Sequence, residues 1–202
     1  MGNRLGLGTT KALIEVEGKP LIGWHLENLM RETDIRVVVG YQAQQVIDTV
    51  RKYRDDIMFV FNHNYQNTKT GASVALAAQY SNEYILSLDG DLLIHPDDMR
   101  TILEYEDEFV SGGKIESDDP WFVQVDKKDE KECAIAFSRN TGQYEWNGIT
   151  QIKSEKILQG GGHVFQLVEP YLPLSFLPVR TREIDTMNDY EKALNWAKCG
   201  FR

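Results

Sequence analysis

Short apolar runs alternate with segments of helical apolar spacing through the first half of this chain. The strand-like runs lie at 35–40, 57–61 and 84–88, and the helix-like segments lie at 21–31, 43–53 and 71–80. Parallel strands need a crossover of about a dozen residues or more, which a helix usually supplies. The alternation therefore predicts βαβ units and an α/β fold with a Rossmann-like, mostly parallel mixed sheet.

The pattern changes in the second half of the chain, between residues 112 and 170. Strand-like runs at 122–125 and 133–137 flank a charged turn, a further run spans 144–152, and three glycines follow at 160–162. A strand at 176–179 and a helix at 188–198 then return to the first pattern. A length of 202 residues suits one domain. We predict a single domain in which residues 112–170 form a small β-rich insertion that covers the substrate.

Charge and cysteine content exclude several classes of protein. The net charge of -9 argues against a nucleic-acid partner, because phosphate backbones require a basic face. Cys133 and Cys199 are too few and too far apart for a disulfide framework or a zinc site. The sequence has neither an apolar run long enough for a membrane span nor a signal segment. These features predict a cytoplasmic protein without a membrane partner, and they leave oligomerisation open.

Two acidic segments follow strand-like runs, and they are the first candidates for chemistry. One is Leu88-Asp89-Gly90-Asp91, and the other is Arg182-Glu183-Ile184-Asp185-Thr186. Ligands of open α/β sheets bind at strand ends, and Mg²⁺ prefers carboxylate and phosphate oxygens. We therefore predict that Asp91 and Asp185 bind one Mg²⁺ ion together. The structural alternatives are a simple turn for the first segment and a helix N-cap for Asp185.

The beginning of the chain is rich in glycine and carries two cations. Residues 2–11 read Gly-Asn-Arg-Leu-Gly-Leu-Gly-Thr-Thr-Lys, with the cations at Arg4 and Lys11. A glycine-rich loop with such cations is typical of phosphate binding. Together with the two acidic segments, this loop predicts metal-assisted chemistry on a nucleoside triphosphate.

Several motifs, taken in order, resemble the nucleotidyltransferases with the glycosyltransferase-A-like fold. They are Gly2-Asn3-Arg4-Leu5, the stretch from Lys11 to Ile22, Phe61-Asn62-His63-Asn64-Tyr65, and Arg182 to Asp185 followed by Asp189-Tyr190. The similarity is strongest to phosphocholine and 2-aminoethylphosphonate cytidylyltransferases. The resemblance implies Mg²⁺-dependent transfer of a nucleoside monophosphate, with CTP as the expected donor, to a phosphorylated small molecule such as phosphocholine, 2-aminoethylphosphonate or a sugar 1-phosphate. Pyrophosphate is the expected second product.

The same resemblance implies roles for individual residues. Arg4 and Lys11 would be catalytic and hold the phosphates, and Asp91 and Asp185 would hold the metal. The nucleotide would contact Gly2, Asn62, Tyr65, Thr70, Gly71, Ser73 and Asp89. The acceptor phosphate would contact Lys153 and Arg182. Because exposed lysines and arginines are usually only solvated, the last two assignments compete with an ordinary surface role.

Two features depart from the family pattern. The family begins with a strand and Leu-Ala-Ala-Gly, whereas this sequence begins with Met1 inside the loop that follows. We therefore expect the first family strand to lie upstream of Met1 or to be absent from a truncated form. Thr10 also stands where the family has a proline before Lys11.

Two other functions remain open at this point. A glycosyltransferase of the same general fold would also use an Asp-x-Asp segment and a metal, but it would consume a nucleotide sugar. A non-catalytic nucleotide-binding remnant is the other alternative. A separate question concerns Trp121, Tyr144 and Trp146, which are suited either to a cage for a quaternary ammonium group or to the core.

Overall fold

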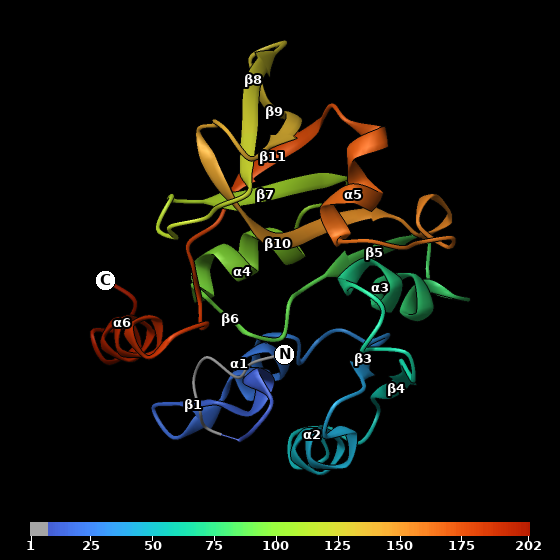
Figure 1. Ribbon diagram of the computed structural model, residues 1–202, viewed down its shortest axis with the longest axis vertical. Coiled ribbons are helices and arrows are strands. Elements are labelled where there is room, and N and C mark those ends of the chain that lie inside the picture. Colours follow the sequence, from blue (N-terminus) through green and yellow to red (C-terminus); the bar gives the residue numbers. More distant parts are fainter. Residues whose placement is uncertain (1–7) are drawn as a thin grey trace. The chain divides into compact units, whose positions relative to one another are not determined.

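The computed structural model describes residues 8–202, which form two compact units (Figure 1). The first unit takes residues 8–63, 89–100 and 181–202, and the second takes residues 64–88 and 101–180. Each unit is therefore assembled from stretches that are far apart in the sequence. The single-domain prediction for residues 1–202, with a substrate-covering insertion at 112–170, stays a prediction.

The first unit contains three small sheets and three helices, and helix α4 begins within it. Its elements are η1 (Lys11–Leu13), β1 (Glu15–Val16), β2 (Lys19–Pro20), α1 (Leu21–Asn28), β3 (Arg36–Val39), α2 (Ala43–Val50), β4 (Met58–Phe61), β6 (Leu92–Ile94), α4 (Pro96–Leu103), β12 (Thr181–Glu183) and α6 (Met187–Lys198). Strands β1 and β2 pair antiparallel, β3 and β4 pair parallel, and β6 and β12 pair antiparallel.

The predicted βαβ unit between residues 35 and 61 is confirmed. Strands β3 and β4 lie parallel, with Arg36 opposite Met58 and Val39 opposite Phe61, and α2 is the crossover between them. The apolar face of α2 is buried because it packs against α1 and the two strands. This core consists of Ile22, Leu26, Val39, Val46, Ile47, Val50 and Ile57. The helical spacing of apolar residues therefore identifies the face that the sheet covers.

A second core joins the elements that carry the acidic segments. It contains Ile14, Val16, Leu21, Leu93, Ile184 and Ala193, all buried, from the β1–β2 hairpin and its approach, α1, β6, the end of β12 and α6. Each fully buried side chain of this kind contributes about 1.5–3 kcal/mol to the stability of the fold. The strands β6 and β12 are only three residues long, so this packing is what holds them in place.

The second unit is built on a six-stranded sheet of order β5-β10-β7-β11-β9-β8 (Figure 1). Its elements are α3 (Thr70–Ala78), β5 (Tyr84–Ser87), β7 (Phe109–Gly113), β8 (Phe122–Lys128), β9 (Lys131–Ser138), β10 (Tyr144–Lys153), η2 (Ser154–Lys156), α5 (Val164–Val168), η3 (Glu169–Tyr171) and β11 (Leu174–Pro178). Helices α3 and α5 contribute Ala78, Val164, Phe165 and Val168 to the core that covers the sheet.

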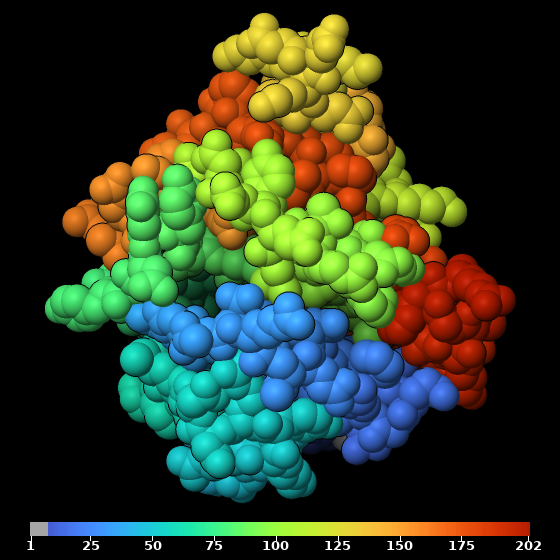
Figure 2. Space-filling model, turned by 180° about the vertical axis from the view of Figure 1, so that it is seen from behind, coloured from blue at the N-terminus to red at the C-terminus, as the bar shows by residue number. Residues whose placement is uncertain are grey.

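The hairpin of β8 and β9 extends beyond the rest of the second unit, where Figure 2 shows it in yellow. Both strands were predicted, but they are longer than the apolar runs at 122–125 and 133–137. Lys128 pairs with Lys131, so the turn consists of Asp129 and Glu130, both with positive φ. Most of the charged residues predicted as a turn therefore lie in strands, where their side chains remain exposed.

The α/β fold class is confirmed, while strand direction differs from the predicted mostly parallel arrangement. Among the strands described within residues 8–202, the parallel pairs are β3–β4 and β7–β11, and the other pairs are antiparallel. The prediction extended the βαβ pattern of the first half to the whole chain. In the second unit, the tight turn at Asp129 and Glu130 joins β8 to β9, so this pair is antiparallel and needs no helical crossover.

The longest described helix, α6, has 12 residues. No helix within residues 8–202 is both long enough and apolar enough to cross a lipid bilayer.

Candidate metal and nucleotide site

The two predicted acidic segments meet through the antiparallel pair of β6 and β12. Glu183 lies opposite Leu92 in this ladder, and the amide of Ile184 donates to the carbonyl oxygen of Asp91 at 3.2 Å. The register therefore places the end of the first acidic segment directly beside the second. This short pairing brings Asp91 and Asp185 together across a long separation in the sequence.

Three carboxylates form the resulting acidic cluster, which we define as Asp91, Glu183 and Asp185. One oxygen from each lies within 4.8 Å of the others. Side chains alternate along an extended chain, so Glu183 and Asp185 lie on one side while Ile184 enters the core on the other. Ile184 is fully buried. The cluster thus contains a residue that the motif comparison missed, Glu183, although the alternation around Ile184 was a signal that could have found it.

The structural alternatives for the two acidic segments have different outcomes. Residues 89–91 do form a turn, in which the amide of Leu92 donates to the carbonyl oxygen of Asp89 at 3.4 Å. Helix α6 is capped by Thr186, whose hydroxyl accepts from the amide of Asp189 at 3.2 Å, while the Asp189 carboxylate accepts from the amide of Thr186 at 2.9 Å. Because Thr186 is the cap, Asp185 is available to the acidic cluster.

Lys11 is the cation of this site. Its Nζ lies 2.7 Å from Oδ2 of Asp91 and also donates to Oδ1 of Asp185. The backbone around it is held by Gln42, which accepts from the amide of Thr10 at 2.7 Å and donates to the carbonyl oxygen of Gly8 at 2.8 Å. The side chain of Lys11 therefore bridges both acidic segments from a supported loop.

The electrostatics of the site show more negative charge than one lysine balances. Burial and the nearby carboxylate of Asp91 raise the pKa of Asp89 to about 7. Burial, Asp91 and Asp185 likewise raise the pKa of Glu183 to about 8. Burial disfavours the charged form of Lys11, but the attraction of Asp91 and Asp185 outweighs it and raises the pKa of Lys11 well above its usual value. Such shifts are expected where like charges are brought together at a functional site.

These residues fit a divalent metal ion of the Mg²⁺ type. The donors are carboxylate oxygens, which hard cations prefer, and their spacing allows one ion to contact more than one of them. The ammonium group of Lys11 lies between Asp91 and Asp185, in the place where such a cation would balance them. The excess negative charge and the carboxylate donors therefore both favour binding of a divalent cation.

The residues predicted to contact the nucleotide are distributed over both units. Gly2 and Arg4 lie outside the described residues. Asn62 is buried at the end of β4, and its backbone amide donates to the carbonyl oxygen of Val39 at 2.9 Å. Tyr65 lies in the turn that precedes α3, and Thr70, Gly71 and Ser73 form the first turn of that helix. Their roles stay predictions.

Gly71 is needed for a close approach within the protein itself. Its amide donates to the carbonyl oxygen of Gly162 at 2.9 Å, and the Thr70 hydroxyl accepts from the amide of Val164 at 3.3 Å. A Cβ at Gly71 would lie 2.8 Å from the oxygen of Gly162 and 2.9 Å from that of Gly161. The contact of this glycine with the nucleotide, which the family resemblance implies, stays a prediction. In the structure, backbone oxygens of residues 161–163 lie against Gly71.

The substitution Gly71→Ala is expected to destabilise the protein by about 1–3 kcal/mol, because a backbone segment must shift to admit the methyl group. Gly161→Ala is the matched control, since a Cβ there meets nothing within 4 Å. Urea unfolding of both variants measures the difference. Equal stabilities for the two variants would contradict the packing described here.

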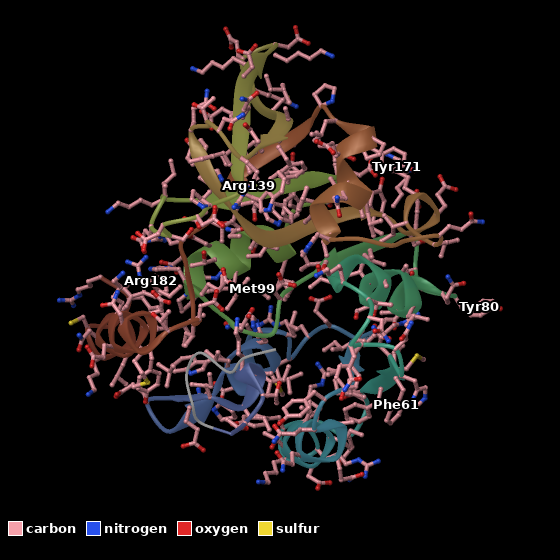
Figure 3. All side chains as sticks on the ribbon, viewed as in Figure 1. Phe61, Tyr80, Met99, Arg139, Tyr171 and Arg182 are labelled. Atoms are coloured by element: carbon pink, nitrogen blue, oxygen red, sulfur yellow. The ribbon has the colours of Figure 1, made fainter. Side chains whose placement is uncertain are left out.

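The two residues predicted to bind the acceptor have partners of their own. The Nζ of Lys153 lies 2.9 Å from Oε1 of Glu83, which raises the pKa of the lysine. The guanidinium of Arg182 lies 5.1 Å from the ring centre of Trp196 on α6 (Figure 3). Because side chains alternate along β12, Arg182 lies on the opposite side of the strand from Glu183. Its role towards an acceptor stays a prediction.

The aromatic residues of the second unit are paired within its core. Ring centres lie 4.2 Å apart for Trp121 and Phe165, 4.4 Å for Tyr144 and Phe176, and 5.1 Å for Trp146 and Phe137. All three pairs belong to one apolar cluster. Between the two roles left open for Trp121, Tyr144 and Trp146, this packing favours the core.

An α/β fold in which carboxylates at strand ends meet a lysine near the start of the chain is the arrangement expected of a nucleotidyltransferase. Residues 1–142 match the family model described as the MobA-like NTP transferase domain. The chain belongs to this family, and its predicted relationship to nucleotidyltransferases is confirmed.

Curated relatives resemble parts of the chain. The bifunctional protein GlmU of a Nitratiruptor species is 28% identical over 158 residues, which are 71% of this chain and 36% of that protein. The choline-phosphate cytidylyltransferase of Streptococcus pneumoniae is 33% identical over 87 residues, which are 42% of this chain and 37% of that protein. The matches therefore span little more than a third of the length of these relatives.

Solved structures share the fold over almost the whole chain. CTP:phosphocholine cytidylyltransferase from Streptococcus pneumoniae has a TM-score of 0.76 and 21% identity, with coverage of 97% of this chain and 94% of the other. The inositol-1-phosphate CTP transferase from T. maritima has a TM-score of 0.75 and 16% identity, with coverage of 100% and 94%. At these identities, the likeness establishes the fold.

Proposed function

We propose that this protein is a Mg²⁺-dependent nucleotidyltransferase that joins a nucleoside monophosphate, from CTP, to a phosphorylated small molecule and releases pyrophosphate. The observation that carries the proposal is the contact of Lys11 with both Asp91 and Asp185, beside Glu183. A triphosphate brings negative charge and requires both a metal and a lysine. The acidic cluster and Lys11 supply the groups for both.

The choice of CTP and of the acceptor is supported by similar proteins. Two structures that share the fold are a CTP:phosphocholine cytidylyltransferase and an inositol-1-phosphate CTP transferase. The candidate acceptors are phosphocholine, 2-aminoethylphosphonate and a sugar 1-phosphate. Each already carries an anionic oxygen, so attack on the α-phosphorus needs no general base and no covalent intermediate.

The chain's own residues would act mainly through charge and position. Asp91, Glu183 and Asp185 would hold the ion, which supplies charge neutralisation on phosphate oxygens when it is bound. The Lys11 ammonium would stabilise the charge that develops on the transferring phosphoryl group. Arg4 would contact the phosphates and Asp89 the nucleotide, as the family resemblance implies.

The test is pyrophosphate release with Mg²⁺ across four nucleotides (CTP, UTP, dTTP and GTP) and three acceptors (phosphocholine, 2-aminoethylphosphonate and glucose 1-phosphate). We expect release with CTP and one acceptor, and no release when either substrate or the metal is omitted.

Two outcomes would replace the proposal. Hydrolysis or transfer of a nucleotide sugar, without pyrophosphate release from any triphosphate, would establish the glycosyltransferase alternative. Thermal stabilisation by CTP without turnover on any substrate pair would establish a nucleotide-binding remnant.

A further inference from the structure

We infer that Gln42 is a positioning residue, whose side-chain amide holds the loop before Lys11 and so directs the Lys11 ammonium group to Asp91 and Asp185. The inference rests on the proposed function in one respect, namely that Lys11 acts on the phosphates. Gln42 lies at the start of α2, in the same unit as the acidic cluster, and has no place in the chemistry described above.

Both polar atoms of the Gln42 side chain bond to the backbone of this loop. Oε1 accepts from the amide of Thr10 at 2.7 Å, and Nε2 donates to the carbonyl oxygen of Gly8 at 2.8 Å. A carboxamide offers an acceptor and a donor side by side, which a backbone segment with a free amide and a free carbonyl group requires. The two bonds therefore hold the stretch of chain that ends directly before Lys11.

The conformation of Gln42 is unfavourable except for these two bonds. Its φ is 52°, in the left-handed region that a residue with a Cβ adopts only at a cost in free energy. Gln42 is also the N-cap residue of α2, yet its side chain makes no capping hydrogen bond to that helix. The helix thus gains little from a glutamine in this conformation, whereas the loop gains two partners.

The residues that follow Lys11 are held by apolar packing. Ala12 and Leu13 pack against the core that α2 forms with α1, β3 and β4. Gln42 holds the residues before Lys11, and this core holds the residues after it. The side chain of Lys11 therefore extends from a backbone that is supported on both sides, and its Nζ lies 2.7 Å from Oδ2 of Asp91.

Thr10 takes part in this arrangement through its backbone amide. Its φ is −67°, the value that a proline ring would fix, and the family has a proline at this place. A proline has no amide hydrogen to donate to Gln42, and its ring would occupy the position of Oε1. The hydrogen bond between Thr10 and Gln42 therefore restrains the loop in the way that a proline ring would restrain it covalently.

Gln42→Met keeps the length of the side chain and removes both bonds. Misplacement of a reacting group lowers rates by up to about 100-fold, so we expect kcat for pyrophosphate release to fall by about 10- to 100-fold. Mn²⁺ affinity without nucleotide, measured by calorimetric titration, should rise about threefold, because a less ordered Lys11 competes less well for Asp91 and Asp185. Loss of structure alone would not raise metal affinity.

Gln44→Met is the matched control. Gln44 lies in the same helix, and its Nε2 donates to Oδ1 of Asp48 at 2.8 Å, on an exposed face. This variant loses a side-chain hydrogen bond of the same kind without touching the loop. We expect it to keep the kcat and the Mn²⁺ affinity of the wild type.

Gln42→Gly keeps the test decisive if the methionine variant fails to fold. Glycine adopts a positive φ without strain, so this variant relieves the backbone cost while it removes the two bonds. We expect it to melt close to the wild-type temperature and to show the same loss of kcat and the same gain in Mn²⁺ affinity as Gln42→Met. A folded variant of either kind with wild-type kcat and Mn²⁺ affinity would overturn the inference.

Thr10→Pro tests whether restraint of the loop is what Gln42 provides. In the wild-type background this change removes the donor and places the ring against Oε1, so turnover should fall. In the Gln42→Gly background the ring meets no side chain and restricts φ to the observed value, so turnover should rise towards that of the wild type. A decrease of the same size in both backgrounds would contradict the positioning role.

The remaining outcomes separate the inference from the proposed function. In a Lys11→Met background, Gln42→Met should change neither kcat nor Mn²⁺ affinity further, and a change as large as in the wild type would overturn the inference alone. Binding of Mn²⁺ by the wild type without turnover on any substrate pair would overturn the proposed function alone, and the Mn²⁺ comparison would still test Gln42. A wild type that neither binds Mn²⁺ nor turns over any substrate pair would overturn both.

Discussion

Replacement of Asp91 by alanine should abolish metal-dependent turnover and leave the fold intact. The carboxylate contacts Lys11 at 2.7 Å and belongs to the acidic cluster with Glu183 and Asp185. In the proposed reaction its loss would remove a donor for the ion and one anchor of Lys11, so we expect turnover to fall by about 10³-fold or more. Pyrophosphate release over a Mg²⁺ titration measures the effect.

The free energy of unfolding of Asp91→Ala should differ little from that of the wild type. The reason is that the carboxylates of Asp89 and Glu183 repel the charge of Asp91 in the folded protein. Asp91 contributes to the raised pKa values of both Asp89 and Glu183, so its removal relieves an unfavourable interaction that offsets the lost pairing with Lys11. Asp48→Asn is a suitable control, since Asp48 is exposed on α2 and accepts a hydrogen bond from Gln44. Near-normal turnover in a folded Asp91→Ala variant would contradict the assignment of the site.

The positions of the acidic segments were predictable because their local sequence is distinctive. Both follow strand-like runs, and Asp-Gly-Asp forms a turn by local preference alone. Their contact was not derivable from local sequence, because it depends on the register of β6 with β12. Each strand has three residues, and all three residues of β6 are buried, so β6 shows no alternation that would reveal a strand.

Glu183 was missed because its place in the site also depends on the register of β6 with β12. In sequence it is one acid among several near Asp185, and only the pairing of Glu183 with Leu92 shows that it faces Asp91. The alternation of Glu183, Ile184 and Asp185 indicated a shared face but not which residue lay opposite. Long-range pairing, rather than local propensity, determines the composition of the site.

The βαβ unit at residues 35–61 was predictable because its local sequence pattern agrees with its tertiary packing. Its strands are apolar, and α2 has a distinct apolar face with Val46, Ile47 and Val50, so local pattern and tertiary packing agree. Gly71 shows where such agreement ends. The backbone at 161–163 that approaches it comes from a distant part of the sequence, so the local sequence does not reveal this packing.

Replacement of Lys11 by methionine should have opposite effects on turnover and on metal binding. In the proposed reaction, loss of the ammonium group would remove stabilisation of the transferring phosphoryl group, and we expect turnover to fall by about 10²–10³-fold. The same ammonium group balances Asp91 and Asp185 when no metal is bound. A divalent ion must displace it, so the methionine variant should bind Mn²⁺ more tightly than the wild type in the absence of nucleotide.

The expected gain in Mn²⁺ affinity is about tenfold. Two unit charges about 4 Å apart near a protein surface attract by about 4 kcal/mol, but partial exposure and the freedom of the lysine side chain reduce the net value to about 1.4 kcal/mol. Lys19→Met is the control, because it removes the same charge from a lysine that pairs with Glu27 instead. If Mn²⁺ affinity fell in Lys11→Met, or rose equally in Lys19→Met, Lys11 would not compete with the metal for Asp91 and Asp185.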